Sequence, residues 1–150
     1  VEFLNSYFLK FPEIKEYMNS TIKFCRKSGY VNNIFGRRTH ISGINDKNFN
    51  VRNFQERAAI NAPIQGSASE IMRMAMIKIY TKFRNEKNIN SKILLQIHDE
   101  LIFETPKNEI KNTIKIIKNE MSSVQNSDLH SFSIPLNVDI NFGENWGILH

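Results

Sequence analysis

Two adjacent carboxylates, Asp99 and Glu100, stand between two apolar stretches in the sequence Gln96–Glu104. Such stretches are typical of strands, and the few residues between them predict a tight turn that leaves both carboxylates accessible. Carboxylate oxygens suit hard cations such as Mg²⁺, which keep water and phosphate oxygens as further ligands. The segment therefore predicts a metal-binding hairpin. A simple polar turn has the same composition, and spacing alone does not separate the two.

Asp99 is the favoured metal ligand of this pair. Successive side chains on a strand point to opposite faces, so Asp99 and Glu100 are not expected to be equal ligands of one ion. His98 precedes them and could act as a base, but no Ser, Cys or second His forms a nucleophilic arrangement with it. The turn thus favours metal-assisted chemistry over a hydrolase triad.

Other common kinds of site find little support. His40, His130 and His150 lie in separate segments and Cys25 is the single cysteine, so no zinc site with closely spaced ligands is predicted. The sequence also has no Gly-rich Walker loop and no GxGxxG motif. We therefore do not expect an ATPase or a Rossmann enzyme.

Helices and short strands must position the turn. Apolar spacing predicts one helix up to Phe11 and another from Pro12 to about Gly29, with the aromatic residues of the first helix in the core. Two short strands are expected at residues 30–31 and 39–41, which places Arg37 and Arg38 near a hairpin tip. The Asn-rich residues 42–53 predict a loop.

A helical pattern resumes at Phe54, and Pro63 is expected to break or bend it before a longer helix over about residues 65–84. Small residues cluster around this proline. They are Ala58, Ala59, Ala62, Gly66, Ser67 and Ala68. Small side chains let another backbone approach, so we expect a partner helix or a groove at this joint.

The last third of the chain predicts strands at residues 92–97 and 101–104, an amphipathic helix from Ile110 to Met121, and a strand from Pro135 to Phe142 with one buried face. Trp146 is expected to anchor the core. The expected fold class is α+β, with helices packed against a small, largely antiparallel sheet in one domain, residues 1–150.

Composition adds a modest constraint. A net charge of +5 and a pI near 9.4 favour a polyanionic partner, although solvated lysine-rich faces give the same balance. No apolar run approaches the roughly 20 residues of a membrane span, and one cysteine fits a reducing compartment. Helical periodicity begins at Val1 without a capping signal, so we expect part of a longer chain.

Four segments occur together in a characteristic order. They are Gly29–Val31 with Gly36–Arg38, Glu56–Gly66, Gln96–Glu104 and Gly143–Trp146. In this order and at these spacings, the chain resembles over nearly its full length the C-terminal part of family A DNA polymerases, the family of bacterial DNA polymerase I. The resemblance implies part of the right-hand polymerase fold: the palm, with its motif C hairpin near residues 94–104, and adjoining helices of the fingers side.

The resemblance implies template-directed addition of deoxynucleotides to a primer 3′ end, in replication and repair, with two Mg²⁺ ions in the complete site. Asp99 matches the metal-bridging aspartate of the hairpin, and Glu100 matches the adjacent carboxylate with a secondary role. His98 and Gln96 match residues close to the primer terminus, where they can hydrogen-bond the last base pair.

The resemblance also implies a surface for the new duplex. Arg57, Asn61 and Gln65 match residues that line it, and their spacing would place them on one side of a helix that continued across Pro63. Donors of this kind suit minor-groove acceptors. Without the family match, Arg57 and Gln65 are ordinary surface residues and Asn61 a cap before the proline. Small neighbours would let DNA come close.

Arg37 and Arg38 could neutralise DNA phosphates. The implied partners are primer-template DNA and deoxynucleoside triphosphates, bound by a monomer without membrane attachment. The expected location is the cytoplasm of a bacterial cell; an organellar or phage source stays open.

Two parts of the family pattern are missing: the first metal-binding aspartate motif and the nucleotide-selecting helix. Asp139 lies in the wrong context to replace that aspartate. We therefore expect the isolated chain to be inactive. One alternative is a non-catalytic DNA-binding module of the same fold. Another is a metal-dependent nuclease, which would need further carboxylates around Asp99.

Overall fold

The computed structural model describes residues 2–127 and 130–148. It divides into two compact units, Val1–Ser67 and Ala68–His150, which we describe separately as the first and second unit. Helix α3 (Phe49–Asn85) contributes residues to both. Among the described residues, no helix has the length and apolar character needed to cross a membrane.

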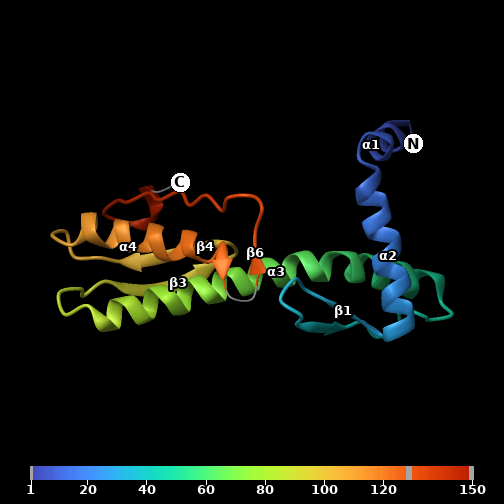
Figure 1. The fold of residues 1–150 in the computed structure, drawn as a ribbon, viewed down its shortest axis with the longest axis horizontal. Coiled ribbons are helices and arrows are strands. Elements are labelled where there is room, and N and C mark those ends of the chain that lie inside the picture. Colours follow the sequence, from blue (N-terminus) through green and yellow to red (C-terminus); the bar gives the residue numbers. More distant parts are fainter. Residues whose placement is uncertain (1, 128–129, 149–150) are drawn as a thin grey trace. The chain divides into compact units, whose positions relative to one another are not determined.

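The first unit combines three helical segments with one small hairpin (Figure 1). Its elements before α3 are α1 (Glu2–Lys10), α2 (Pro12–Ser28), β1 (Tyr30–Asn32) and β2 (Arg38–His40). Strands β1 and β2 pair antiparallel. Pro12 lies in the first turn of α2, where its missing N–H costs nothing, and Gly29 ends the helix with a φ of 78°. These elements confirm the sequence-based prediction.

The core of the first unit lies where α2, β1 and α3 meet. Its buried residues are Cys25, Val31, Ile41, Ile44 and Ala59. The prediction that the aromatic residues of the first helix lie in a core is wrong for Tyr7 and for Phe11, which directly follows α1, while Phe8 is partly buried. Tyr7 is 39% exposed and Phe11 is 41% exposed, with their ring centroids 5.2 Å apart. A helical stripe needs a partner surface, and the described residues offer α1 little beyond the adjacent α2.

Helix α3 runs unbroken from residue 49 to residue 85. The predicted loop is therefore confirmed for residues 42–48 and wrong for residues 49–53, and the alternative of a break at Pro63 is wrong. The helix starts early because the Asn48 side chain accepts a hydrogen bond from the backbone N–H of Asn50 at 2.9 Å, an N-cap arrangement. Pro63 removes only one backbone donor, and its own carbonyl also accepts the Ser67 hydroxyl at 2.6 Å.

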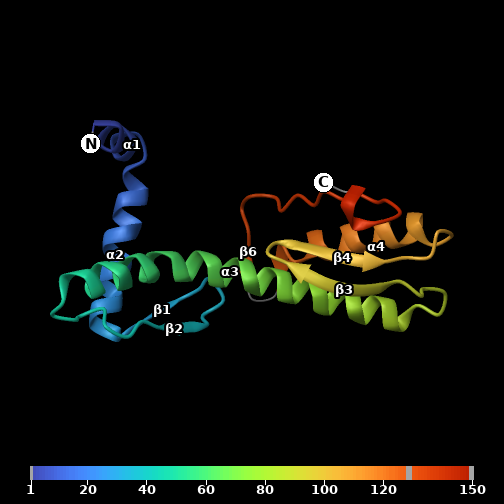
Figure 2. The ribbon, with the colours of Figure 1, turned by 180° about the vertical axis from the view of Figure 1, so that it is seen from behind.

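The second unit packs two helices with a hairpin. Its elements after α3 are β3 (Lys92–Ile97), β4 (Glu100–Glu104), α4 (Ile110–Ser123), β5 (Asn126–Ser127), β6 (His130–Ser131) and the 3-10 turn η1 (Trp146–Ile148). The later half of α3 and helix α4 lie beside the β3–β4 hairpin in both views (Figures 1 and 2). Ile79, Phe83, Ile116 and Ile117 form their shared core.

The predicted strand from Pro135 to Phe142 is not a strand in the structure. Leu136, Val138 and Ile140 are partly buried while the residues between them are exposed, so the predicted alternation is present in burial as far as Ile140, but Phe142 is exposed. A strand also needs a hydrogen-bonded neighbour, which the described residues do not provide here.

Two smaller predictions near the C-terminal end are also wrong. Trp146 is 48% exposed in η1 and does not anchor the core. The polar link after α4 contains the short antiparallel pair of β5 and β6, which its composition did not indicate.

Candidate active site and duplex-binding surface

The β3–β4 hairpin closes through a two-residue loop. Ile97 pairs with Glu100, which leaves His98 and Asp99 as the loop and makes Glu100 the first residue of β4. The paired strands β3 and β4 hold the two ends of this turn together. Their register is irregular between Ile93 and Leu95. The sequence thus predicted the hairpin correctly.

The side chains at this turn are accessible. Gln96, His98, Asp99 and Glu100 are all exposed. The Gln96 amide donates a hydrogen bond to the His98 carbonyl at 2.9 Å and so braces the loop. His98 has a φ of 52°, a left-handed conformation that is uncommon for residues other than glycine. Such a residue at an exposed polar turn is a feature typical of functional sites.

The carboxylates of Asp99 and Glu100 have the right chemistry for a hard cation, because Mg²⁺ is bound through oxygen ligands. Within the described residues, however, no group of three or more His, Cys, Asp or Glu side chains could hold a metal ion. The turn fits a metal as a partial ligand set, to be completed by water, by substrate phosphates or by other protein residues.

A second set of predicted site residues lies on the part of α3 in the first unit. Arg57, Asn61 and Gln65 are exposed and follow one another at intervals of four residues. Because α3 continues through Pro63, this spacing places them on one side of a single helix. We call these three residues the α3 row. Three exposed polar side chains on one side of a continuous helix are the arrangement expected of the predicted duplex-binding surface.

Helix α2 contacts α3 directly beside the α3 row. The Arg26 guanidinium forms an ion pair with the Glu56 carboxylate. The Tyr17 hydroxyl donates to the carbonyl oxygen of Ile60 at 2.9 Å. Glu56 and Ile60 each precede a member of the row in the chain, so α2 fixes the backbone from which the row projects.

The β1–β2 hairpin carries the two predicted phosphate-binding arginines. Arg37 and Arg38 are exposed, and the Arg38 guanidinium lies 4.6 Å from the centre of the Tyr30 ring. The preceding Asn33 is buried and was missed in the sequence. The only local signal for it was an asparagine near the turn glycine Gly36.

The small residues around Pro63 serve the packing of the first unit. Ala59 is fully buried, and Ala58 and Ala62 pack against the same core. A Cβ at Gly66 would lie 3.6 Å from the Cβ of Asn33. The small side chains thus admit α2 and the β1–β2 hairpin, which is the close backbone approach that the sequence predicted.

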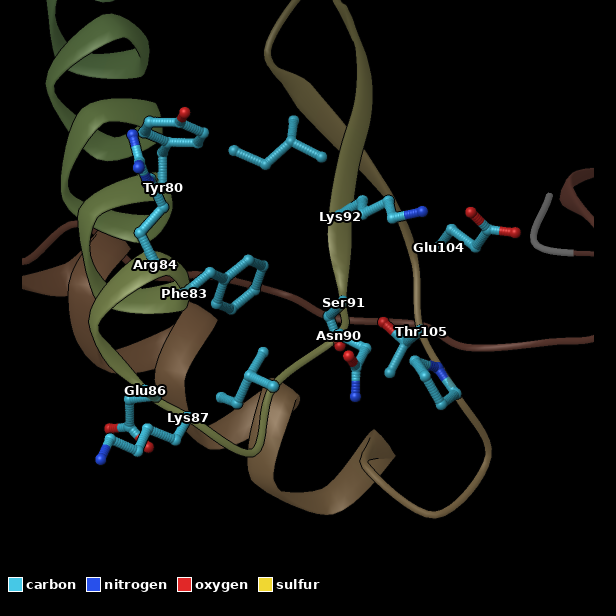
Figure 3. A pocket seen from close by; sticks show the side chains of 13 residues that line it. Tyr80, Phe83, Arg84, Glu86, Lys87, Asn90, Ser91, Lys92, Glu104 and Thr105 are labelled. Atoms are coloured by element: carbon cyan, nitrogen blue, oxygen red, sulfur yellow. The ribbon is translucent and has the colours of Figure 1, made fainter.

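A pocket of about 850 Å³ lies at the end of the β3–β4 hairpin opposite the His98–Asp99 turn. Figure 3 shows Tyr80 and Arg84 of α3 on one side and Lys92 and Glu104 of the hairpin on the other. None of the predicted site residues lines this pocket. Its mixed charges do not indicate a particular ligand.

A buried carboxylate fixes the same end of the hairpin. Glu109 accepts hydrogen bonds from the backbone N–H and the side-chain amide of Asn90, each at 2.8 Å, and from the Ser91 hydroxyl at 3.2 Å. These donors favour the ionised form and lower the pKa of Glu109 below its ordinary value, against the opposing effect of burial. The Glu109 carboxylate therefore holds residues 90 and 91 in place beside the start of β3.

The sequence is similar to known proteins over nearly its whole length. The family model for DNA polymerase family A matches residues 1–148. This chain belongs to DNA polymerase family A. It is 44% identical over 145 residues to DNA polymerase I of Caldicellulosiruptor bescii and 42% identical over 148 residues to DNA polymerase I of Borreliella burgdorferi.

A solved structure agrees with this membership. The polymerase domain of Pol1 from M. smegmatis, in complex with a DNA primer-template and dNTP, matches 97% of this chain with a TM-score of 0.88 and 33% identity. The family A chain described here covers 25% of that structure. The match to the C. bescii protein covers 97% of this chain and 16% of that protein. The match to the B. burgdorferi protein covers 99% of this chain and 16% of that protein.

Proposed function

We propose that this chain forms the part of a DNA-directed DNA polymerase active site that carries the motif C hairpin and a surface for the primer-template duplex. The observation that carries the proposal is the exposed Asp99–Glu100 turn, held on two paired strands in a chain of DNA polymerase family A. The primer-template DNA and dNTP bound to the similar M. smegmatis domain support the choice of substrates.

In the proposed reaction, the primer 3′ hydroxyl attacks the α-phosphorus of a deoxynucleoside triphosphate. A phosphodiester bond forms, and the bond to the leaving pyrophosphate breaks. Bound Mg²⁺ would lower the cost of deprotonating the hydroxyl and would neutralise charge on the phosphates. Asp99 is the principal ligand from this chain and Glu100 the secondary one, with remaining ligands from outside the turn.

The other predicted residues bind and orient DNA. His98 and Gln96 lie at the same turn as the carboxylates, where hydrogen bonds to the primer terminus would hold the 3′ hydroxyl close to them. The α3 row presents amide and guanidinium donors, which suit the acceptors shared by correct base pairs in the minor groove. Arg37 and Arg38 supply positive charge for phosphates.

The proposal extends to a monomeric enzyme that acts in the bacterial cytoplasm with Mg²⁺ in replication and repair. The relatives that support it are bacterial DNA polymerases I. The chain alone should extend no primer, because its sequence has neither the first metal-binding aspartate motif nor the nucleotide-selecting helix of the family pattern.

A chimera tests the proposal. The 145-residue matched segment of the C. bescii polymerase is replaced by the corresponding residues of this chain, and primer extension is measured with Mg²⁺. We expect extension by the chimera and none by the isolated chain. A folded chimera that binds duplex without extending it would contradict the polymerase assignment and favour a non-catalytic DNA-binding module. Sustained extension by the isolated chain would contradict the requirement for additional residues.

A further inference from the structure

Asn33 is a polar residue in the interior of the first unit. It follows β1 and is only 7% exposed. A buried amide that lacks hydrogen bonds is destabilising, so its partners explain why it is tolerated there. In the structure, both the oxygen and the nitrogen of its carboxamide have hydrogen-bond partners.

The Asn33 carboxamide bonds two separate parts of the backbone. Its Oδ1 accepts hydrogen bonds from the N–H groups of Phe35 at 3.0 Å and Arg37 at 2.9 Å. Its Nδ2 donates to the carbonyl oxygen of Gly66 at 3.2 Å. One side chain therefore connects the backbone of Arg37 with the helical residue that directly follows Gln65.

A second connection lies beside the first. The N–H of Ile34 donates to the Ser67 hydroxyl at 3.2 Å, and that hydroxyl donates to the Pro63 carbonyl at 2.6 Å. The turn of the β1–β2 hairpin is thus attached at two points to one turn of α3. Ser67 is itself buried, so both attachments lie away from solvent.

We propose that Asn33 is a positioning residue for duplex binding, which ties the Arg37 backbone to α3 next to Gln65. The inference rests on the proposed function and names a residue that acts through Arg37 and the α3 row without touching DNA. Fixing the turn in advance removes the cost of ordering an arginine-bearing loop when the duplex binds.

The chemistry of the side chain makes the inference testable. Asn33→Asp retains an oxygen acceptor for the two turn N–H groups but replaces the donor to Gly66 by a second acceptor. The turn keeps its internal bonds and loses its attachment to the helix. Asn32→Asp is the matched control, because Asn32 is the exposed neighbour and the substitution adds the same charge.

The experiment uses the chimeric polymerase and a fluorescent primer-template duplex. The Kd and its salt dependence are measured by anisotropy, and kcat by single-nucleotide extension at saturating DNA. For N33D we expect about fivefold weaker binding, as for the loss of one net hydrogen bond, with kcat unchanged. We also expect the salt slope to fall by up to about one, as for a lost phosphate contact. N32D should change Kd by less than about twofold.

A double variant identifies the route of the effect. If Asn33 acts through Arg37, then N33D should weaken binding much less in an R37A background than in the parent. Equal losses in both backgrounds would overturn the inference, as would equal Kd values for N33D and N32D. A fall in thermal stability with unchanged Kd and salt slope would leave Asn33 a purely structural residue and would also overturn it.

Should N33D fail to fold, Asn33→Ser decides by the same measurements, since its short side chain with one hydroxyl cannot bond the turn N–H groups and the Gly66 carbonyl together. The parent chimera separates this inference from the proposed function. A parent that binds and extends the duplex while N33D or N33S binds normally refutes the positioning role alone.

Discussion

The two hairpins of this chain are held in opposite ways. The turn between β1 and β2 is attached to α3 by the side chains of Asn33 and Ser67, both buried. The turn between β3 and β4 has only exposed residues from His98 to Glu100, and the hydrogen bond from the Gln96 side chain to the His98 carbonyl stays within the hairpin. One turn is fixed by its own chain, while the other presents its polar groups to whatever binds there.

The backbone conformations follow the same division. The β1–β2 turn places glycine, Gly36, at its left-handed position with a φ of 81°. The β3–β4 turn places His98 in the left-handed region, where a side chain raises the conformational energy. A turn optimised for stability would use glycine in both places. The histidine therefore indicates that the second turn is shaped by function, in agreement with its proposed place at the primer terminus.

The largest effect should come from the exposed turn. In the chimeric polymerase, Asp99→Ala should reduce primer extension by about a thousandfold or more, because several kcal/mol of transition-state stabilisation depend on the metal site. Duplex Kd should stay within about threefold, since this side chain binds no DNA directly. Asp139→Ala, at another exposed carboxylate, should leave both unchanged. Full activity of the Asp99 variant would refute the metal assignment.

A smaller effect is expected on the helix that the first turn supports. Arg57→Ala should weaken duplex binding by about tenfold, as expected for one contact to a base edge. Lys118→Ala removes an exposed positive charge from α4 and should change Kd by less than about twofold. Anisotropy titrations at several salt concentrations measure both. Similar losses in the two variants would mean that general positive charge, and not the α3 row, binds the duplex.

The two left-handed positions should respond to substitution with opposite signs. Gly36→Ala should lower the free energy of unfolding by about 1 kcal/mol, because alanine rarely adopts this φ. His98→Gly should leave that free energy unchanged or raise it by up to about 1 kcal/mol, while impairing primer extension. Urea unfolding of the chain and extension by the chimera are the measurements. A destabilised His98→Gly would show that the histidine serves stability.

The smallest effect concerns the opposite end of the β3–β4 hairpin. Because hydrogen bonds from Asn90 and Ser91 lower the pKa of Glu109, its stabilising effect is present above the usual value of about 4.5. The effect is lost as the pH falls through the lowered pKa. Glu109→Gln should therefore be less stable than the parent at pH 7, and the difference should narrow in acid. Urea unfolding across pH tests this.

The control for that measurement is Glu104→Gln, at an exposed carboxylate on the end of β4. It should show no comparable narrowing as the pH falls. If the Glu109 variant behaves in the same way as this control, the hydrogen bonds from residues 90 and 91 do not set the acid sensitivity of the hairpin.

Local features were predictable from the sequence. The β3–β4 turn follows from two apolar runs with a short polar connection, all within thirteen residues of chain. The α3 row follows from its spacing of four residues, once the helix is known to continue. That continuity was not predictable, because a helix tolerates an internal proline where tertiary packing, such as that of Ala59 in the core, offsets the lost hydrogen bond.

Features that join distant segments were not predictable. Asn33 bonds a residue 33 positions away, so its role has no local sequence pattern. Residues 135–142 show the converse case, in which a local pattern is present but the predicted strand does not form. Their alternation predicted the partial burial of Leu136, Val138 and Ile140 but failed at Phe142, which is exposed, and pairing requires a neighbouring strand that no local pattern can supply.

The double attachment of the β1–β2 turn has a consequence for the exchange of amide hydrogens with solvent. Amides in short turns normally exchange rapidly, but those of Ile34, Phe35 and Arg37 all bond to Asn33 or Ser67. The bonds of Phe35 and Arg37 stay within the turn, whereas exchange of the Ile34 amide requires the turn to detach from α3 or the helix to open there. Deuterium uptake at Ile34, compared with uptake at Phe35 and Arg37, would therefore report on a helix to which none of the three residues belongs.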